Sequence, residues 1–227
     1  MIDKKRSLYD YSVRTNYQCE EVYNNNKHID ILRISLYDGV IFDPTKIPKS
    51  VNKLMIYSNL NFNINDIPSN IKQLYFYKYN NLLEQLPISI EEISIEKEFN
   101  RCVDDLGNNF KIIDFGWDFN QPVDNLPNSL EKLCFGNNFN HPINNLPQKL
   151  KVLYIHNYNY NYSLIKKIPS SLIFIEFGTN NNNDYYDIFE NIIINKKYVH
   201  YLENNKGMDH GYASGSNYLN KYFFISE

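Results

Sequence analysis

The chain has 227 residues, of which 43% are hydrophobic, and this size and composition favour one domain with a sizeable core. It contains 36 Asn, 27 Ile and 20 Tyr but one Ala, which argues against a helical bundle because Ala is the best helix former. The net charge of −3 supplies no overall positive field, and no apolar run approaches a membrane span, so we expect neither nucleic acid nor a membrane as a partner.

The first 26 residues, 1–26, are predicted to form an N-terminal cap. Tyr9, Tyr11 and Val13 alternate with polar residues, as in a short strand. The basic start of the chain is not followed by an apolar segment, so we expect no secretory signal. The three cysteines are far apart in the sequence and cannot all pair with one another, which favours a reducing, cytoplasmic setting.

Residues 27–183 carry an internal repeat of about twenty residues. Within each unit, apolar residues recur at positions 5, 8 and 10, and an eighth unit at the N-terminal side is predicted from Ile31, Ile34 and Leu36. Because several columns keep one register over so many residues, chance does not explain the pattern. Six of the units begin with an apolar residue followed by proline: Ile47-Pro48, Ile67-Pro68, Leu86-Pro87, Leu126-Pro127, Leu146-Pro147 and Ile168-Pro169.

This spacing is the leucine-rich-repeat pattern, in which positions 8 and 10 of a short strand point into the core. One unit cannot bury its apolar face alone, so neighbouring units stack and form a curved parallel sheet. Twenty residues leave little room for a return helix, and proline at position 2 disfavours helix as well. We therefore predict a mainly β, leucine-rich-repeat-like solenoid of about eight units with an extended return side.

Two further columns follow each predicted strand. An aromatic residue or Leu is expected to point inward and fill the space that a helix would otherwise fill, as at Phe99, Phe119 and Phe139. The Asn after it is expected to turn the chain and to hydrogen-bond neighbouring backbone. Part of the Asn excess thus has a predicted structural role, and the rest is typical of AT-rich codons.

Residues 184–227 are predicted to form a C-terminal cap and tail. Apolar residues at helical spacing, with acidic side chains early and lysines late, indicate a capping helix at about 184–197. The glycine-containing stretch 204–217 is predicted to be a loop, and Tyr218–Ile225 is apolar enough to dock back or pair as a strand.

The usual catalytic and metal-binding patterns are missing from the sequence. No spacing of His, Cys or carboxylates matches a metal or cofactor motif, so we expect no cofactor and no enzymatic activity. Cys134 stands at outward position 9, but no histidine shares its column, so we expect the thiol to lack a base. Glu92 and Glu96 belong to the densest acidic cluster, yet they lie ~13 Å apart along one strand, beyond glycosidase geometry.

Positions 7, 9 and 11 of each unit alternate outward, and their side chains vary while the inward columns do not. Tyr is frequent among them, and Tyr is enriched in recognition surfaces. The face is predicted to bind another protein, with a solvated scaffold face as the alternative. The predicted partner-binding residues are Lys53, Met55, Tyr57, Gln73, Tyr75, Tyr77, Glu92, Glu96, Asp114, Tyr154, Phe174 and Glu176.

The segments 115–123 and 126–143, with their Phe-Asn pairs and following Pro, resemble the FNIP repeat, a leucine-rich-repeat variant of amoebae and of giant viruses that infect them. The resemblance covers residues 47–180 well and 27–46 weakly. It implies a cytoplasmic protein (in the host cytoplasm if viral) that acts through protein–protein interaction.

Relatives in that family often carry an F-box before the repeats, which implies substrate recognition in ubiquitin ligases. Residues 1–26 hold no apolar stripe long enough for such a domain. The first hypothesis is therefore a non-enzymatic module that binds a protein on its concave strand face. The alternative is an F-box-less component of the ubiquitin pathway, with the host ubiquitin machinery as partner, and a third class is an enzyme with an unrecognised site.

Overall fold

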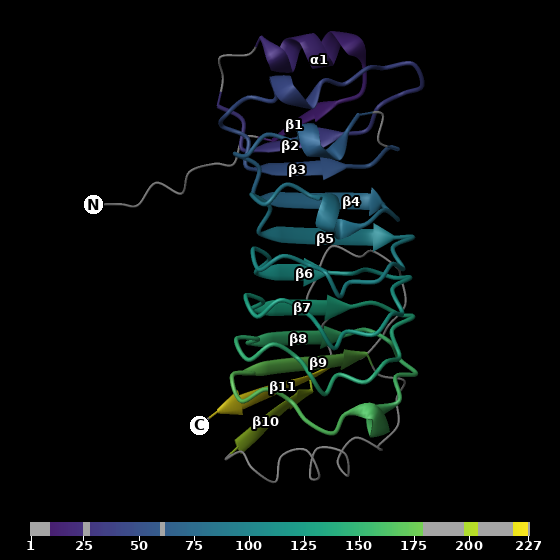
Figure 1. Cartoon of the computed structure of the whole chain (residues 1–227), viewed down its shortest axis with the longest axis vertical. Helices are drawn as coiled ribbons and strands as arrows, with labels where there is room; N and C mark the ends of the chain where they lie inside the picture. Colours follow the sequence, from purple (N-terminus) through teal and green to yellow (C-terminus); the bar gives the residue numbers. More distant parts are fainter. Residues whose placement is uncertain (1–9, 25–27, 60–61, 179–197, 204–219, 227) are drawn as a thin grey trace, which may run out of the picture.

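Eleven strands form one sheet in the part of the chain that the structure, a computed structural model, describes (Figure 1). These described residues are 10–24, 28–59, 62–178, 198–203 and 220–226, the last two ranges by their backbone. Strands β1 to β9 follow one another in chain order and run parallel, whereas β11 pairs antiparallel with β9, and β10 with β11. The predicted mainly β solenoid with a parallel sheet is confirmed.

Each strand is short because one unit supplies one rung of the sheet. Inward side chains such as Leu54 and Ile56 are buried, while the residues between them are half-buried, as the alternation of a strand requires. The strand bounds are β1 Asp10–Val13, β2 Ile31–Ile34, β3 Lys53–Ile56, β4 Gln73–Lys78, β5 Glu92–Lys97, β6 Ile112–Asp114, β7 Lys132–Phe135, β8 Val152–Ile155, β9 Phe174–Gly178, β10 Tyr198–Glu203 and β11 Asn220–Ser226.

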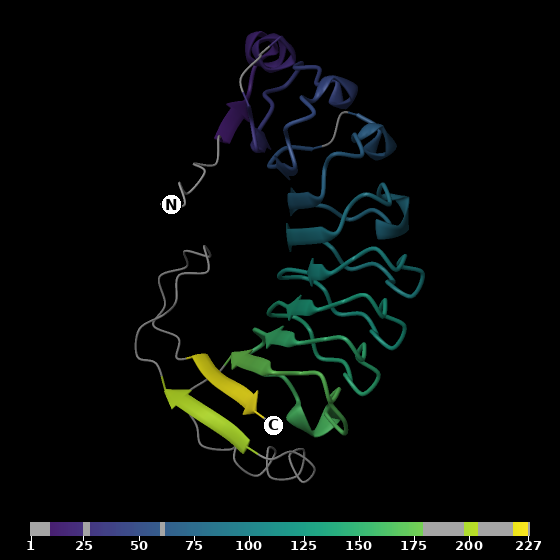
Figure 2. The same cartoon turned by 90° about the vertical axis from the view of Figure 1, so that its left-hand side faces the viewer.

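The return side is extended, as predicted. Its regular elements among the described residues are single 3₁₀ turns at Pro44–Lys46, Ile64–Asp66, Leu83–Gln85 and Tyr162–Leu164. Seen edge-on, the sheet is an open arc with the strands on its inner side and the return segments on its outer side (Figure 2). The strand face is therefore the concave face of the molecule.

The second inward column forms a stack of aromatic rings. Phe119 is fully buried, and its ring centroid lies 4.1 Å from that of Phe115 in its own unit. It also lies 5.7 Å from Phe99 and 6.1 Å from Phe139, in the two adjoining units, with the planes within 8° of parallel. These rings take the volume that a return helix fills in thicker solenoids.

The Asn after each aromatic residue forms a ladder along the solenoid. The backbone N–H of Asn120 donates to Asn100 Oδ1 at 2.9 Å, and that of Asn140 donates to Asn120 Oδ1 at 2.9 Å. The ladder begins at Asn80 and ends at Asn161. Each side chain thus satisfies a turn N–H of the next unit, which confirms the predicted role of this column.

The N-terminal end contains a helix that the sequence reasoning missed. Strand β1 pairs with β2 as predicted for a capping strand, and α1, Asn16–Tyr23, packs beside it. The side chain of Thr15 caps the helix by accepting from the N–H of Gln18. Thr followed three residues later by Gln is a capping-box pattern, so the sequence did carry a signal for this helix.

The predicted register of the first unit is wrong by two residues. Leu32 pairs with Leu54 and Ile34 with Ile56, so the buried triplet is Ile29, Leu32 and Ile34 rather than Ile31, Ile34 and Leu36. A shift of two residues keeps every side chain on the same face, so hydrophobic alternation alone does not fix the choice. The pairing with β3 fixes it, and the unit is 22 rather than 20 residues long, counted from Ile34 to Ile56.

At the C-terminal end, Tyr218–Ile225 was predicted to dock back or to pair as a strand, and β11 confirms the strand over residues 220–225. The predicted capping helix at 184–197 and the predicted loop at 204–217 lie outside the described residues.

Candidate functional site

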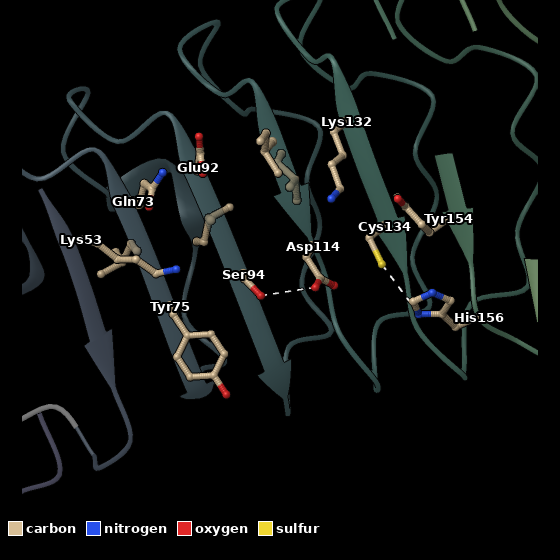
Figure 3. A pocket seen from close by; sticks show the side chains of 14 residues that line it. Lys53, Gln73, Tyr75, Glu92, Ser94, Asp114, Lys132, Cys134, Tyr154 and His156 are labelled. Atoms are coloured by element: carbon tan, nitrogen blue, oxygen red, sulfur yellow. Dashed lines mark hydrogen bonds between the residues drawn. The ribbon is translucent and has the colours of Figure 1, made fainter. Parts of the chain in front are cut away.

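A half-open groove of about 280 Å³ lies on the concave strand face (Figure 3). Six consecutive strands, β3 to β8, contribute to it, because outward positions of neighbouring units stand side by side in the parallel sheet. Its lining includes the apolar side chain of Ile112 and several charged and aromatic groups around it. The groove therefore forms because the repeat aligns the outward positions of neighbouring units.

Half of the predicted partner-binding residues meet in this groove. The residues concerned are Lys53, Gln73, Tyr75, Glu92, Asp114 and Tyr154.

The other predicted residues lie outside its lining. Met55, Tyr57, Tyr77, Glu96 and Phe174 are half-buried on the same face of the sheet.

Ser94, Lys132, Cys134 and His156 also line the groove and were not among the predicted binding residues. They occupy positions 9, 7, 9 and 11 of their units, so the repeat register places them on this face, although it does not single them out as binding residues.

Asp114, at the end of β6, lies in the middle of the groove lining. Its carboxylate accepts a hydrogen bond from the Ser94 hydroxyl at 3.3 Å and one from the backbone N–H of Gly116 at 3.0 Å. Both donors fix the side chain, which lies between Ser94 and Cys134 (Figure 3). The groove thus has an oriented negative charge at its middle.

Cys134 does have a histidine beside it, and the expectation that no histidine would reach this thiol is wrong. Cys134 Sγ lies 3.8 Å from His156 Nδ1 of the next unit (Figure 3). The two residues occupy positions 9 and 11, which are diagonal neighbours across paired strands.

The thiol is nevertheless held in its neutral form. Burial, and then the negative charge of Asp114, raise the pKa of Cys134 well above its ordinary value. Because the thiolate is the nucleophile, this environment disfavours reactivity.

Glu176, on β9, is fully buried rather than solvated, although the repeat register puts it at an outward position. Neither of its carboxylate oxygens has a hydrogen-bond partner among the described residues, and Oε1 lies 4.0 Å from His156 Nε2. Burial raises the pKa of this carboxyl to about 7. Glu176 was predicted to contact a partner on this face. Its side chain has no exposed surface in the structure, so a direct contact with a partner is not supported.

Aromatic groups flank the groove at both ends. At one end the Tyr57 and Tyr75 ring centroids are 5.3 Å apart, and the Tyr75 hydroxyl hydrogen-bonds the Glu96 carboxylate. At the other, Tyr154 lies between Phe174, at 5.4 Å, and Lys132, whose Nζ is 5.0 Å from the Tyr154 ring centroid. Such half-buried Tyr side chains offer large contact area at low entropic cost.

Within the described ranges, no group of three or more His, Cys, Asp or Glu is placed to hold a metal ion. Over the same part of the chain, no helix has the length and apolarity needed to cross a membrane.

A family model described as FNIP Repeat matches residues 59–98, 99–138, 119–158 and 139–180. Together the matches extend over residues 59–180, which is more than half of the 227. Comparison with curated proteins and with solved structures gave no match.

Proposed function

The chain belongs to the FNIP repeat family, and we propose that it is a non-enzymatic interaction module that binds another protein along its concave strand face. The observation that carries this proposal is the groove, which draws its lining from six consecutive strands. Solenoid repeat proteins characteristically bind partners on such extended concave surfaces.

The chemistry of the face supports a protein partner. Tyr75 and Tyr154 present aromatic surface, Ile112 is apolar, and Lys53 and Glu92 supply opposite charges within the same groove. Protein interfaces combine an apolar and aromatic centre with polar groups around it. A groove of about 280 Å³ fits a short extended segment or a protruding loop of the partner.

The non-enzymatic part of the proposal rests on the state of Cys134. The arrangement of Cys134, His156 and Glu176 has the order of a nucleophile, a base and an orienting carboxylate. Burial and then the nearby carboxylates, however, raise the pKa of the thiol, whereas a nucleophilic cysteine needs a lowered one.

A role in the ubiquitin pathway stays a prediction, since the comparisons identify no partner. A ligase subunit that co-purifies with the chain and cross-links to its concave face would support that role.

The proposal is tested by site-specific photo-cross-linking in a cell extract. A photoreactive amino acid replaces Gln73 in the groove or, as the matched control, Glu84 in the 3₁₀ turn on the return side. We expect a defined protein to cross-link from position 73 and not from position 84. Equal cross-linking from both positions, or cross-linking from the return side alone, would contradict binding on the concave face.

A second test uses paired substitutions. Tyr75→Ala with Glu92→Ala should abolish capture of the cross-linked protein, because both side chains line the groove. Glu84→Ala with Asp105→Ala removes two exposed side chains of the return side and should leave capture unchanged. Circular dichroism verifies that both double variants remain folded.

A further inference from the structure

A second groove, which we call the asparagine groove, lies outside the strand face. It has a volume of about 510 Å³, and the described residues that line it are seven Asn and Asp118. They stand in the turns that follow β5 to β8, beyond the arrowheads of these strands (Figure 1). None of them lines the groove of the concave face, so this is a separate surface of the molecule.

The Asn ladder leaves one end of each amide unused in this groove. Asn100, Asn120 and Asn140 each accept a turn N–H of the next unit through Oδ1. A backbone N–H needs an acceptor opposite it, so the oxygen faces the ladder and the NH₂ group is left over. All three residues are exposed, and none of these NH₂ groups donates a hydrogen bond within the described part of the chain. The groove therefore contains a row of amide donors, one for each unit.

Acceptors stand beside these donors. The Asp118 carboxylate is held by the backbone N–H of Glu98, at 2.8 Å, and by the NH₂ group of Asn138, at 3.3 Å. Each carboxylate oxygen accepts one of these bonds, and a carboxylate has about four lone-pair positions, so acceptor capacity is left. Asn138 uses its NH₂ group in this contact, and its Oδ1 accepts no hydrogen bond from the described residues. Donors and acceptors are thus held in place before a ligand binds, which lowers the entropic cost of binding.

The groove repeats in line along the solenoid. The aromatic residue directly before each ladder Asn measures the spacing: the ring centroids of Phe99 and Phe119 are 5.7 Å apart, and those of Phe119 and Phe139 are 6.1 Å apart. This spacing is close to the length of one sugar ring in an extended, β-linked oligosaccharide. Sugar hydroxyls both donate and accept hydrogen bonds, so each ring matches one rung with its donor and its acceptor.

Other classes of ligand fit the asparagine groove less well. Its described lining includes no apolar side chain, whereas the centre of a protein interface is apolar and aromatic. The same lining includes no cationic side chain for a phosphate, and Asp118 repels anions. A Ca²⁺ ion takes about six to eight oxygen ligands, but the groove offers a single carboxylate, and the ladder already occupies three of its amide oxygens.

We propose that the asparagine groove binds a neutral, extended oligosaccharide. The NH₂ groups of the ladder donate to its hydroxyls, and Asp118 and Asn138 accept hydrogen bonds from neighbouring hydroxyls of the same rings. This site goes beyond the protein-binding function proposed for the concave face and does not depend on it.

The direct test is a titration of the full chain with cellotriose, an extended neutral trisaccharide, followed by NMR. The side-chain NH₂ resonance of Asn120 is identified by its loss in Asn120→Asp. We expect it to shift in a saturable way with a Kd of about 1 mM, because each hydrogen bond that forms replaces one to water. Glucose, which spans one rung, and maltotriose, whose linkage curves the chain, should bind about tenfold more weakly because they reach fewer rungs.

Two pairs of substitutions separate the site from the fold, with affinities measured by isothermal titration calorimetry. Asn137 and Asn159 line the groove, and their side chains make no hydrogen bond within the described ranges, so replacing them leaves the ladder intact. Asn137→Ala with Asn159→Ala should weaken cellotriose binding about tenfold. Asn108→Ala with Asn128→Ala is the matched control, since both residues are exposed outside the lining, and should leave the affinity unchanged.

Asn120→Asp tests the ladder donor itself. It keeps an oxygen for the Asn140 N–H and removes the NH₂ group, so it should weaken cellotriose binding about threefold while the chain stays folded.

The absence of a saturable shift with cellotriose, or equal affinities in the two double variants, would overturn the proposed site. Equal affinities for cellotriose and glucose would overturn a ligand that extends over several rungs.

Discussion

Phe119 lies in the middle of the aromatic stack, and we expect truncation of its side chain to destabilise the fold strongly. Its side chain is fully buried, and four other rings lie around it, those of Phe99, Phe115, Phe135 and Phe139. The substitution Phe119→Ala would leave a cavity in a part of the solenoid where no return helix can move in to fill it.

The expected loss is at the upper end of the range for buried aromatics. Replacing a buried Phe by Ala costs about 3–5 kcal/mol through lost transfer energy and the cavity. Aromatic pairs add about 0.5–1.5 kcal/mol beyond their buried area, and Phe119 takes part in four of them. We therefore expect a loss of about 4–5 kcal/mol, a large share of the ~5–15 kcal/mol that stabilises a typical domain.

The assay is equilibrium unfolding in urea followed by circular dichroism. The matched control is Trp117→Ala, which removes a larger ring two residues away that is 48% exposed, and should cost less than about 1 kcal/mol. Phe119→Leu keeps most of the volume and should cost about 1.5 kcal/mol. A loss below about 1.5 kcal/mol for Phe119→Ala, or one no larger than that of Trp117→Ala, would refute the role given to the stack.

Three further outcomes follow from the structure. Asn120→Ala removes the acceptor of the Asn140 N–H and should lower the free energy of unfolding in urea by about 1–2 kcal/mol. Asn120→Asp keeps an acceptor oxygen and should lower it less, so equal losses in the two variants would argue against the ladder. Gly136→Ala would place a Cβ 2.0 Å from the backbone oxygen of Gly116 in the preceding unit and should lower the melting temperature strongly. In Gly107→Ala the new Cβ meets only the flexible side chain of Asn109, so the melting temperature should change little. Similar melting temperatures for the two variants would contradict the close approach of the Gly116 and Gly136 backbones. Because burial raises the pKa of Glu176 from 4.5 to about 7, the folded state binds its proton more tightly, and stability should fall as pH rises through that window by about 3 kcal/mol relative to Glu176→Gln. Parallel pH profiles of the two proteins in urea unfolding would show that this carboxyl is not perturbed.

The sequence by itself determined the repeat and almost everything that the repeat implies. The unit length, the inward positions 5, 8 and 10, the aromatic column and the Asn ladder all follow from periodicity, since identical units must stack and each column then meets its own kind. The face that carries the groove follows from the same rule, because outward positions alternate with buried ones.

The tertiary structure decided what identical spacing leaves open. The register of the first unit depended on the pairing of Leu32 with Leu54, because a two-residue shift preserves the pattern of buried side chains. The contact between Cys134 and His156 depended on a diagonal across two strands. Glu176 is buried on β9, the last parallel strand, which pairs with β11 instead of with another repeat unit. The periodicity of the repeat does not predict that pairing. Columns are a property of the sequence, whereas contacts between columns and at the ends of the sheet exist only once the chain has folded.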